Sequence, residues 1–251
     1  GGAAVATGLG YSITAIVGLL VFSNRNSLLH FVRPVCRPQT LGRAVTNGCS
    51  EMATALVNGI ITLMFNWTML KYVGEDGVAA ITIISYVLAF AGSLYAGYAY
   101  GVAPMLSFYY GEQNHEKLRK LVRTSLKIIG VIAAATVLVS LAVTEPLVSI
   151  FARPGTPVYD LAVAGNRICS LALLFVGFNI FASGMFTALS NGLISAVLAF
   201  SRTFVFTLIA MLVLPVILGV TGIWLATPAA ELAAVVLSAV MLLKYRRRYC
   251  Y

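Results

Sequence analysis

Charged residues are scarce in this sequence. Only 10% of its residues are Asp, Glu, Lys or Arg, whereas soluble domains average about 25%. Hydrophobic residues make up 60% of the chain, and its mean hydropathy is +0.93. This composition excludes an ordinary soluble domain and indicates an integral membrane protein.

The residue types that carry most enzyme chemistry are also few. The four cysteines are scattered without the paired spacing of a metal site, and the only histidines, His30 and His115, lie in basic segments. The sequence has no glycine-rich loop of the Walker type, which excludes nucleotide hydrolysis by that route. We expect no catalytic residue, no metal and no cofactor, so any work must draw on an ion gradient, on ligand binding or on a partner chain.

Long apolar runs occupy most of the chain. Several exceed the ~20 residues that a membrane-spanning helix needs, and none alternates in the manner of a transmembrane barrel strand. We therefore predict an all-α membrane protein with about seven transmembrane helices. The predicted spans are 3–22, 46–70, 78–108, 124–144, 158–188, 194–215 and 221–243.

Basic residues are concentrated in alternate connecting segments. Most of the 17 fall in residues 23–45, in residues 109–127 and in the tail that follows residue 243. Because loops rich in Lys and Arg stay in the cytoplasm, we place these segments and the C-terminus there, in a multi-pass protein of the plasma (inner) membrane. Basic loops beside spans attract anionic lipid headgroups, and we interpret the ending "KYRRRYCY" as a topology anchor with interfacial tyrosines rather than a nucleic-acid groove. We therefore expect the lipid bilayer as partner and no nucleic acid.

Four ionisable residues lie inside the predicted spans: Glu51, Arg167, Arg202 and Glu231. Such residues are costly in a membrane and usually face the bundle interior or an aqueous cavity. Arg202 and Glu231 fall at similar depth on consecutive spans, which predicts a structural ion pair. Arg167 either joins them or lines a cavity, and Glu51 either handles a proton or cation or makes a structural hydrogen bond.

Uncharged polar residues supply further candidates. Asn58 and Asn66 are two helical turns apart on the second span, and we interpret Asn66 as structural while Asn58 is equally suited to a cavity. On the third span, Tyr95 and Tyr98 lie well before the basic segment. They fit either an interfacial aromatic belt or a cavity wall.

Several segments resemble one transporter family. "NGCSEMATALVNGIITLMFNWTML" followed by "YGVAPMLSFYYGEQNHEKLRKL" is similar to the seventh and eighth helices of the multidrug and toxic compound extrusion (MATE) family. "NRICSLALLFVGFNIFASGMFTALSNG" resembles its tenth helix, "GVTGIWLATPAAELAAVVLSAVMLL" its twelfth, and "GGAAVATGLGYSITAIVGLLVF" its sixth. The segments match in order over the whole chain, so the resemblance is more specific than a single motif.

The resemblance implies two six-helix lobes that face each other across a central cavity and alternate between outward-open and inward-open states. Residues 1–22 would then be the last helix of the N-terminal lobe, residues 23–45 a basic cytoplasmic interlobe loop, and residues 46–251 the C-terminal lobe. Five helices of the N-terminal lobe are absent from this sequence, so we expect a truncated portion whose partner is that missing lobe. Asn58 stands where one subgroup has a coupling acid, and the tenth-helix segment has no acid in its interior. We therefore expect the Na⁺ or H⁺ coupling site in the missing lobe.

A polar stripe on the tenth-helix segment has two interpretations. Asn179, Ser183 and Thr187 recur every fourth residue and share one helix face. In the resembled family this helix borders the cavity, so the stripe would bind water, a cation or a drug. Alternatively, the three side chains bond neighbouring helices, helped by Gly177 and Gly184, which permit close approach.

The leading functional hypothesis is secondary active efflux of amphipathic or cationic organic compounds by Na⁺ or H⁺ antiport. One alternative is a flippase of lipid-linked saccharides from the same superfamily, whose cavities are strongly basic. Another is a membrane fragment that transports nothing.

Overall fold

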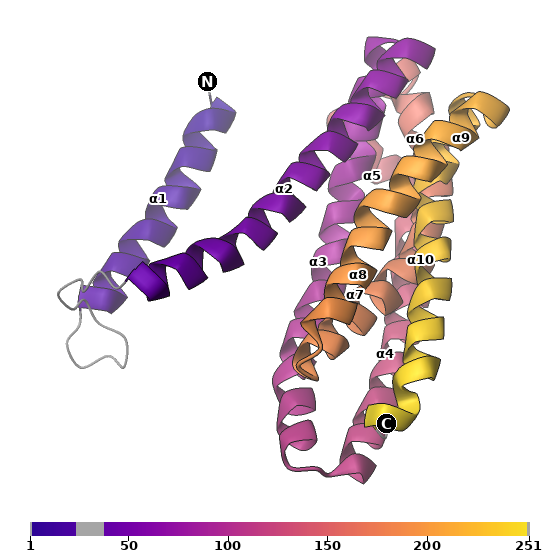
Figure 1. Cartoon of the computed structure of the whole chain (residues 1–251). Coiled ribbons are helices and arrows are strands. Elements are labelled where there is room, and N and C mark those ends of the chain that lie inside the picture. Colours follow the sequence, from indigo (N-terminus) through magenta and orange to yellow (C-terminus); the bar gives the residue numbers. More distant parts are fainter. Residues whose placement is uncertain (1, 24–37, 250–251) are drawn as a thin grey trace. The chain divides into compact units, whose positions relative to one another are not determined.

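The computed structural model of the chain describes residues 2–23 and 38–249, and all regular structure within these ranges is helical (Figure 1). The α-helices are α1 (Gly2–Ser23), α2 (Pro38–Tyr72), α3 (Glu75–Gly111), α4 (His115–Ala142), α5 (Thr144–Phe151), α6 (Pro157–Cys169), α7 (Leu173–Ala188), α8 (Gly192–Phe200), α9 (Thr207–Leu218) and α10 (Val220–Tyr249). A 3₁₀ turn, η1 (Ser170–Ala172), joins α6 to α7, and a π-helical turn, η2 (Ser201–Phe206), joins α8 to α9.

The chain divides into two compact units, residues 1–51 and residues 52–251. The first contains α1 and the beginning of α2, and the second contains everything from the later part of α2 onward. The unit boundary thus falls inside α2, a few residues after the lobe boundary at residue 46 that the resemblance implies. The second unit holds the candidate site and is described below.

Five helical segments among the described residues are long and apolar enough to cross a membrane: α3, α4, α6 through α7, α8 through α9, and α10. They coincide with five of the seven predicted spans, so the chain is an all-α membrane protein. Helices α1 and α2 occur at the other two predicted positions, but parts of both lie outside the residues whose side chains are described. The eight-residue helix α5 was not predicted, because it is too short to produce a span-length apolar signal.

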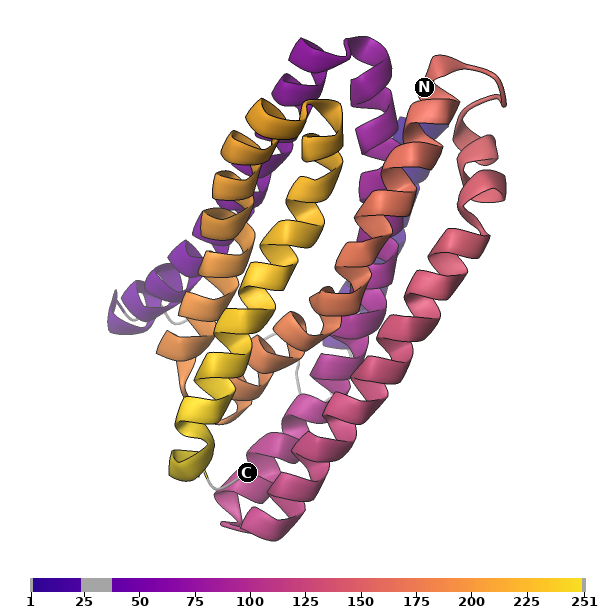
Figure 2. The same cartoon turned by 90° about the vertical axis from the view of Figure 1, so that its right-hand side faces the viewer.

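The long helices α3, α4 and α10 of the second unit run along a common direction, and the connecting turns lie at two ends (Figures 1 and 2). The α2–α3 and α9–α10 turns lie at one end, which also carries Glu75 and Asp76 and is called the acidic end below. The α3–α4 turn and the C-terminus lie at the other end, with the basic start of α4, and this is called the basic end.

Local sequence explains where these helices begin. Asn114, Thr156 and Asn191 each accept a hydrogen bond from the backbone N–H three residues later, at 3.2, 3.4 and 3.3 Å respectively. The tight α9–α10 turn requires glycine, as the sequence predicts. Gly219 has φ of 60°, and a Cβ on Gly222 would come within 2.1 Å of the Leu214 carbonyl oxygen.

Three apolar clusters fill the interior of the second unit. One at the acidic end includes Met69, Ile84 and Trp224, and one at the basic end includes Phe186 and Tyr249. The third lies between them, around Tyr95, Ala133, Leu173 and Val176. The polar groups described next interrupt this core between its two ends.

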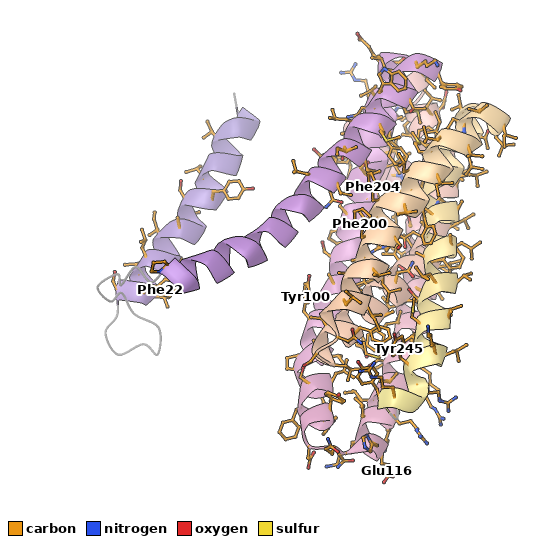
Figure 3. The ribbon with its side chains drawn as sticks, in the orientation of Figure 1. Phe22, Tyr100, Glu116, Phe200, Phe204 and Tyr245 are labelled. Carbon is orange, nitrogen blue, oxygen red and sulfur yellow. The ribbon has the colours of Figure 1, made fainter. Side chains whose placement is uncertain are left out.

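Large apolar side chains also cover the outside of the helices. Tyr100 on α3 is 76% exposed and Phe200 on α8 is 53% exposed (Figure 3). An exterior of this kind suits contact with lipid tails, because apolar surface facing hydrocarbon has no hydration cost.

Candidate functional site

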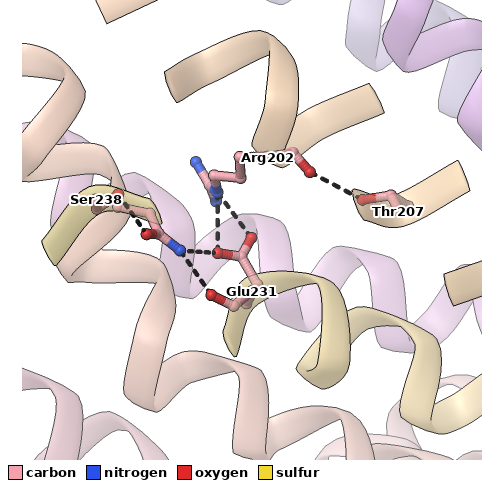
Figure 4. A network of polar contacts seen from close by, with 5 residues as sticks. Arg202, Thr207, Glu231 and Ser238 are labelled. Carbon is pink, nitrogen blue, oxygen red and sulfur yellow. Dashed lines mark hydrogen bonds and ion pairs between the residues drawn. The ribbon is translucent and has the colours of Figure 1, made fainter. Parts of the chain in front are cut away.

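Arg202 and Glu231 are in contact inside the second unit. Arg202 Nε donates to Glu231 Oε1 at 2.8 Å and to Oε2 at 2.9 Å (Figure 4). The Arg202 side chain is 25% exposed and that of Glu231 only 11%. The structure thus places side by side the two charges that the sequence assigned to an ion pair.

Two further polar side chains complete this group. Asn179 Nδ2 donates to Glu231 Oε2 at 2.7 Å and to the Glu231 carbonyl oxygen at 3.0 Å. Ser238 Oγ donates to Asn179 Oδ1 at 3.0 Å. Glu231 and Ser238 are seven residues apart on α10 and therefore present one face toward α7. These four residues are called the polar network below.

The backbone at Arg202 is irregular. Residues 201–206 form the π-helical turn η2, and Thr207 Oγ1 donates to the Arg202 carbonyl oxygen, five residues earlier, at 3.1 Å. A π-turn adds one residue to the helical repeat and shifts the direction of the side chains that follow. Such turns occur often at functional sites, and here the turn carries the only basic member of the network.

Both oxygens of the Glu231 carboxylate are hydrogen-bonded within the polar network. Both oxygens of Glu231 accept from Arg202, and one also accepts from Asn179. The pair is neutral overall, and its members are hydrogen-bonded, which is the condition under which buried charges are stable. The arrangement favours structural coupling of α7, η2 and α10 over capture of a free cation.

The rest of the polar stripe on α7 also bonds to a neighbouring helix. Ser183 and Ser195 share a hydroxyl hydrogen bond of 3.0 Å, and Thr187 and Ser195 share another of 2.7 Å. Asn179 is buried, at 2% exposure. These contacts are the interhelical bonds of one interpretation of the stripe. That the stripe also lines a cavity stays a prediction, and Thr187 is exposed.

Gly177 and Gly184 were both expected to permit close approach of a neighbouring helix, and only Gly177 does so. A Cβ on Gly177 would lie 2.5 Å from the Tyr95 ring, so this glycine does permit a close approach between α7 and α3. A Cβ on Gly184 would meet only the Ala99 Cβ, at an ordinary 3.9 Å.

Three other cavity candidates line none of the three pockets described below. Tyr95 is buried, and its hydroxyl donates to the Leu173 carbonyl oxygen at 2.8 Å and bonds the Thr136 hydroxyl at 2.5 Å. Tyr98 is half-buried against the apolar cluster at the basic end. Arg167 joins neither the polar network nor a cavity, because its Nη2 pairs with Glu145 Oε1 at 2.9 Å and both side chains are more than half exposed.

A large pocket lies at the acidic end between α2, α3, α5 and α6. It has a volume of about 910 Å³, and its lining includes Asn66, Trp67, Glu75, Asp76, Tyr86 and Phe151. This acidic pocket combines two carboxylates with three aromatic rings. The Lys71 ammonium lies 5.7 Å from the centre of the Trp67 ring, within the usual distance of a cation–π contact.

A smaller pocket lies between α2, α3, α6 and α10. It has a volume of about 170 Å³ and is lined by Thr62, Asn66, Ser85, Cys169 and Thr227 together with apolar side chains. We call it the small polar pocket. Asn66 lines both pockets, so the two meet at this residue on α2.

The face of α2 that lines these two pockets is more polar in function than the sequence analysis predicts. Asn66 was assigned to structure alone, and Thr62 and Trp67 were not singled out. The signal was present, because Asn58, Thr62 and Asn66 recur every fourth residue, as the stripe on α7 does. Asn58 is exposed on α2, and Glu51 lies among the residues whose side chains are not described, so its predicted role stays a prediction.

Comparison with known proteins gives a consistent result. The family model MatE matches residues 52–213. The multidrug export protein MepA of Staphylococcus haemolyticus (strain JCSC1435) is 22% identical over 249 residues, which cover 98% of this chain and 54% of that protein. The chain thus spans about half the length of this curated relative.

Solved structures agree on the fold. The inward-facing conformation of a multidrug resistance MATE family transporter of the MOP superfamily superposes with a TM-score of 0.83 at 22% identity, covering 99% of this chain and 57% of that one. The outward-facing conformation of such a transporter gives 0.78 at 22% identity, covering 99% and 56%. A MOP superfamily transporter from Pyrococcus furiosus, reported with a binding pocket of reverse polarity that suggests a different function, gives 0.79 at 21% identity, covering 99% and 56%.

Proposed function

Because the chain belongs to the MatE family, we propose that it is part of a secondary active exporter of amphipathic or cationic organic compounds, driven by entry of Na⁺ or H⁺. Family members are transporters and not enzymes, in accord with a sequence that offers no catalytic group. The observation that carries the substrate class is the acidic pocket, where Glu75 and Asp76 stand beside exposed aromatic rings. Carboxylates and aromatic faces both attract organic cations, and the apolar remainder of the lining suits an amphipathic body.

Pocket polarity separates this proposal from the flippase alternative. A cavity for lipid-linked saccharides with anionic phosphates needs basic side chains, and no basic residue lines the acidic pocket. Arginines do line a pocket at the basic end, but its volume is about 250 Å³ against about 910 Å³ for the acidic pocket. The Pyrococcus furiosus transporter is reported with a binding pocket of reverse polarity that suggests a different function, and we use the sign of the pocket charge in the same way. Efflux of cations is the better supported reading of this chain.

Transport by alternating access also needs two lobes that move around a site between them. The chain spans about half the length of its relatives, so we propose that it works with a second, N-terminal lobe. We place ion coupling in that lobe, because the carboxylate of Glu231 is already neutralised and hydrogen-bonded. We orient the basic end toward the cytoplasm of the plasma (inner) membrane, by the distribution of Lys and Arg.

Ethidium binding tests the substrate class. We expect the purified chain in neutral detergent to bind ethidium, and the double variant Glu75→Gln/Asp76→Asn to bind it about tenfold more weakly, since each lost charge removes roughly 0.5–1 kcal/mol of attraction. The matched control is Glu112→Gln/Glu116→Gln, which removes the same charge at the opposite end of the helix pair α3–α4. Equal weakening by both pairs would argue for net charge alone and against the acidic pocket as the site.

Cellular efflux tests the two-lobe proposal. The chain should export ethidium from cells when it is joined to, or co-expressed with, a family N-terminal lobe, and an uncoupler or removal of Na⁺ should stop export. Efflux of the same rate from the chain alone would contradict the need for that lobe. It would point instead to a homodimer in which two identical chains occupy the positions of the two lobes.

A further inference from the structure

A second kind of pocket opens at the basic end of the bundle, between α4 and α10. It has a volume of about 250 Å³ and is lined by Arg119, Arg123 and Arg246 together with aliphatic side chains that include Leu126, Leu242 and Leu243. The pocket lies at the end that holds the α3–α4 turn and the C-terminus (Figure 2). It is called the arginine pocket below.

The charge of the arginine pocket is uncompensated within the described part of the chain. No acidic residue lines it, and the salt bridges found among the described residues join Arg167 to Glu145 and Arg202 to Glu231. Arg119 and Arg123 are four residues apart on α4, so their side chains lie on one helix face, where like charges repel. Arg246 adds a third positive charge from α10. Three guanidinium groups around one pocket indicate an anionic occupant.

The remaining wall of the pocket is apolar. Leu243 is 69% exposed, and Leu126 and Leu242 are half-buried. Both wall helices belong to membrane-spanning segments, His115–Ala142 and Val220–Arg246. The pocket therefore has a guanidinium rim near the membrane surface and an aliphatic wall that continues toward the hydrocarbon.

A guanidinium group binds phosphate oxygens with two parallel N–H donors, and leucine side chains suit an acyl chain. We propose that the arginine pocket binds the phosphodiester headgroup of an anionic phospholipid, with an acyl chain against Leu126, Leu242 and Leu243. The bound lipid links α4 to α10. A zwitterionic phospholipid is disfavoured, because its quaternary ammonium group meets three arginines and no carboxylate.

Phosphatidylglycerol titration tests this proposal on the purified whole chain in a neutral detergent, with native mass spectrometry and thermal unfolding as readouts. Wild-type protein should bind dioleoyl phosphatidylglycerol and unfold at higher temperature in its presence. The triple variant Arg119→Gln/Arg123→Gln/Arg246→Gln should bind it about 10- to 100-fold more weakly, because each basic group near an anionic headgroup raises the affinity for the lipid roughly two- to fivefold. Dioleoyl phosphatidylcholine, glycerol 3-phosphate and inorganic phosphate should bind weakly to both proteins.

The matched control is Lys117→Gln/Lys120→Gln/Lys127→Gln, which removes three charges from the same helix without touching the pocket lining. It should retain wild-type affinity for phosphatidylglycerol. Equal losses in the two triple variants would overturn the proposal in favour of diffuse attraction. Binding of phosphatidylcholine or of inorganic phosphate as tight as that of phosphatidylglycerol would also overturn it. If the arginine triple variant does not elute as folded protein, the single variants Arg123→Gln and Lys127→Gln are compared in the same titration. Weaker binding of phosphatidylglycerol by Arg123→Gln alone supports the proposal, and equal weakening in both overturns it.

Discussion

Asn179 and Glu231 are joined twice across the α7–α10 contact, because the Asn179 amide donates to both the carboxylate and the backbone carbonyl of Glu231. The same carboxylate receives Arg202 from the π-turn η2 (Figure 4). One buried acid thus ties together three helical segments that are far apart in sequence.

Glu231→Gln should destabilise the chain by about 3–5 kcal/mol, because Arg202 is left as an uncompensated, largely buried charge. Arg202→Met should cost a similar amount for the reciprocal reason. The double variant should recover a substantial part of the loss, since no lone charge remains. The measurement is the temperature at which the monodisperse peak is lost in size-exclusion chromatography. Additive losses in the double variant would show that the pair contributes no coupling energy.

Cysteine labelling should distinguish the α2 face from the α7 stripe. In a background with all four native cysteines replaced, Asn66→Cys should react with a small water-soluble thiol reagent, and ethidium should slow the reaction, because Asn66 lines both pockets. Asn179→Cys should stay unreactive, because that position is buried between helices.

The control for labelling is Leu212→Cys on the outside of α9. Leu212 is 58% exposed but belongs to an apolar span, so lipid or detergent should cover it and prevent reaction. Labelling at position 179 with none at position 66 would indicate that the α7 stripe lines the cavity and that α2 does not.

Gly177→Ala should destabilise the chain by about 1–3 kcal/mol, since the added methyl group would overlap the Tyr95 ring. Gly184→Ala is the matched control, on the same face of α7 and two helical turns further along. Its methyl group meets only Ala99 at a normal distance, so it should be neutral or gain up to about 1 kcal/mol from helix propensity. Thermal unfolding of the two variants measures the difference, and equal effects would place α7 farther from α3 than the structure does.

Ser125→Ala should be neutral or stabilising by about 1 kcal/mol, because the Ser125 hydroxyl is fully buried and has no hydrogen-bond partner among the described residues. Ser140→Ala on the same helix is the comparison, since Ser140 shares a 2.7 Å hydroxyl hydrogen bond with Ser170. We expect it to cost about 1 kcal/mol. A loss of stability at Ser125 as large as at Ser140 would indicate a partner, such as a buried water, for the Ser125 hydroxyl.

The sequence by itself determined the class of the protein and the positions of five of its seven predicted spans. A helix in hydrocarbon must be long, apolar and internally hydrogen-bonded, so run length and composition predict it without knowledge of its neighbours. The same reasoning predicted that Arg202 and Glu231 lie at similar depth in the membrane, because depth follows from the distance along a span. Turn residues such as Gly219 and Gly222 were also readable, since their requirement is local.

The tertiary structure alone decided which polar face meets a pocket. Asn58, Thr62 and Asn66 on α2 have the same four-residue spacing as Asn179, Ser183 and Thr187 on α7. This spacing shows that each set shares a helix face, but it carries no information on the rotation of that face about the helix axis. Rotation is set by packing between helices, as where Gly177 admits the Tyr95 ring and turns Asn179 toward α10. The α7 face was thereby taken up by α8 and α10, while Asn66 on α2 was left beside open space.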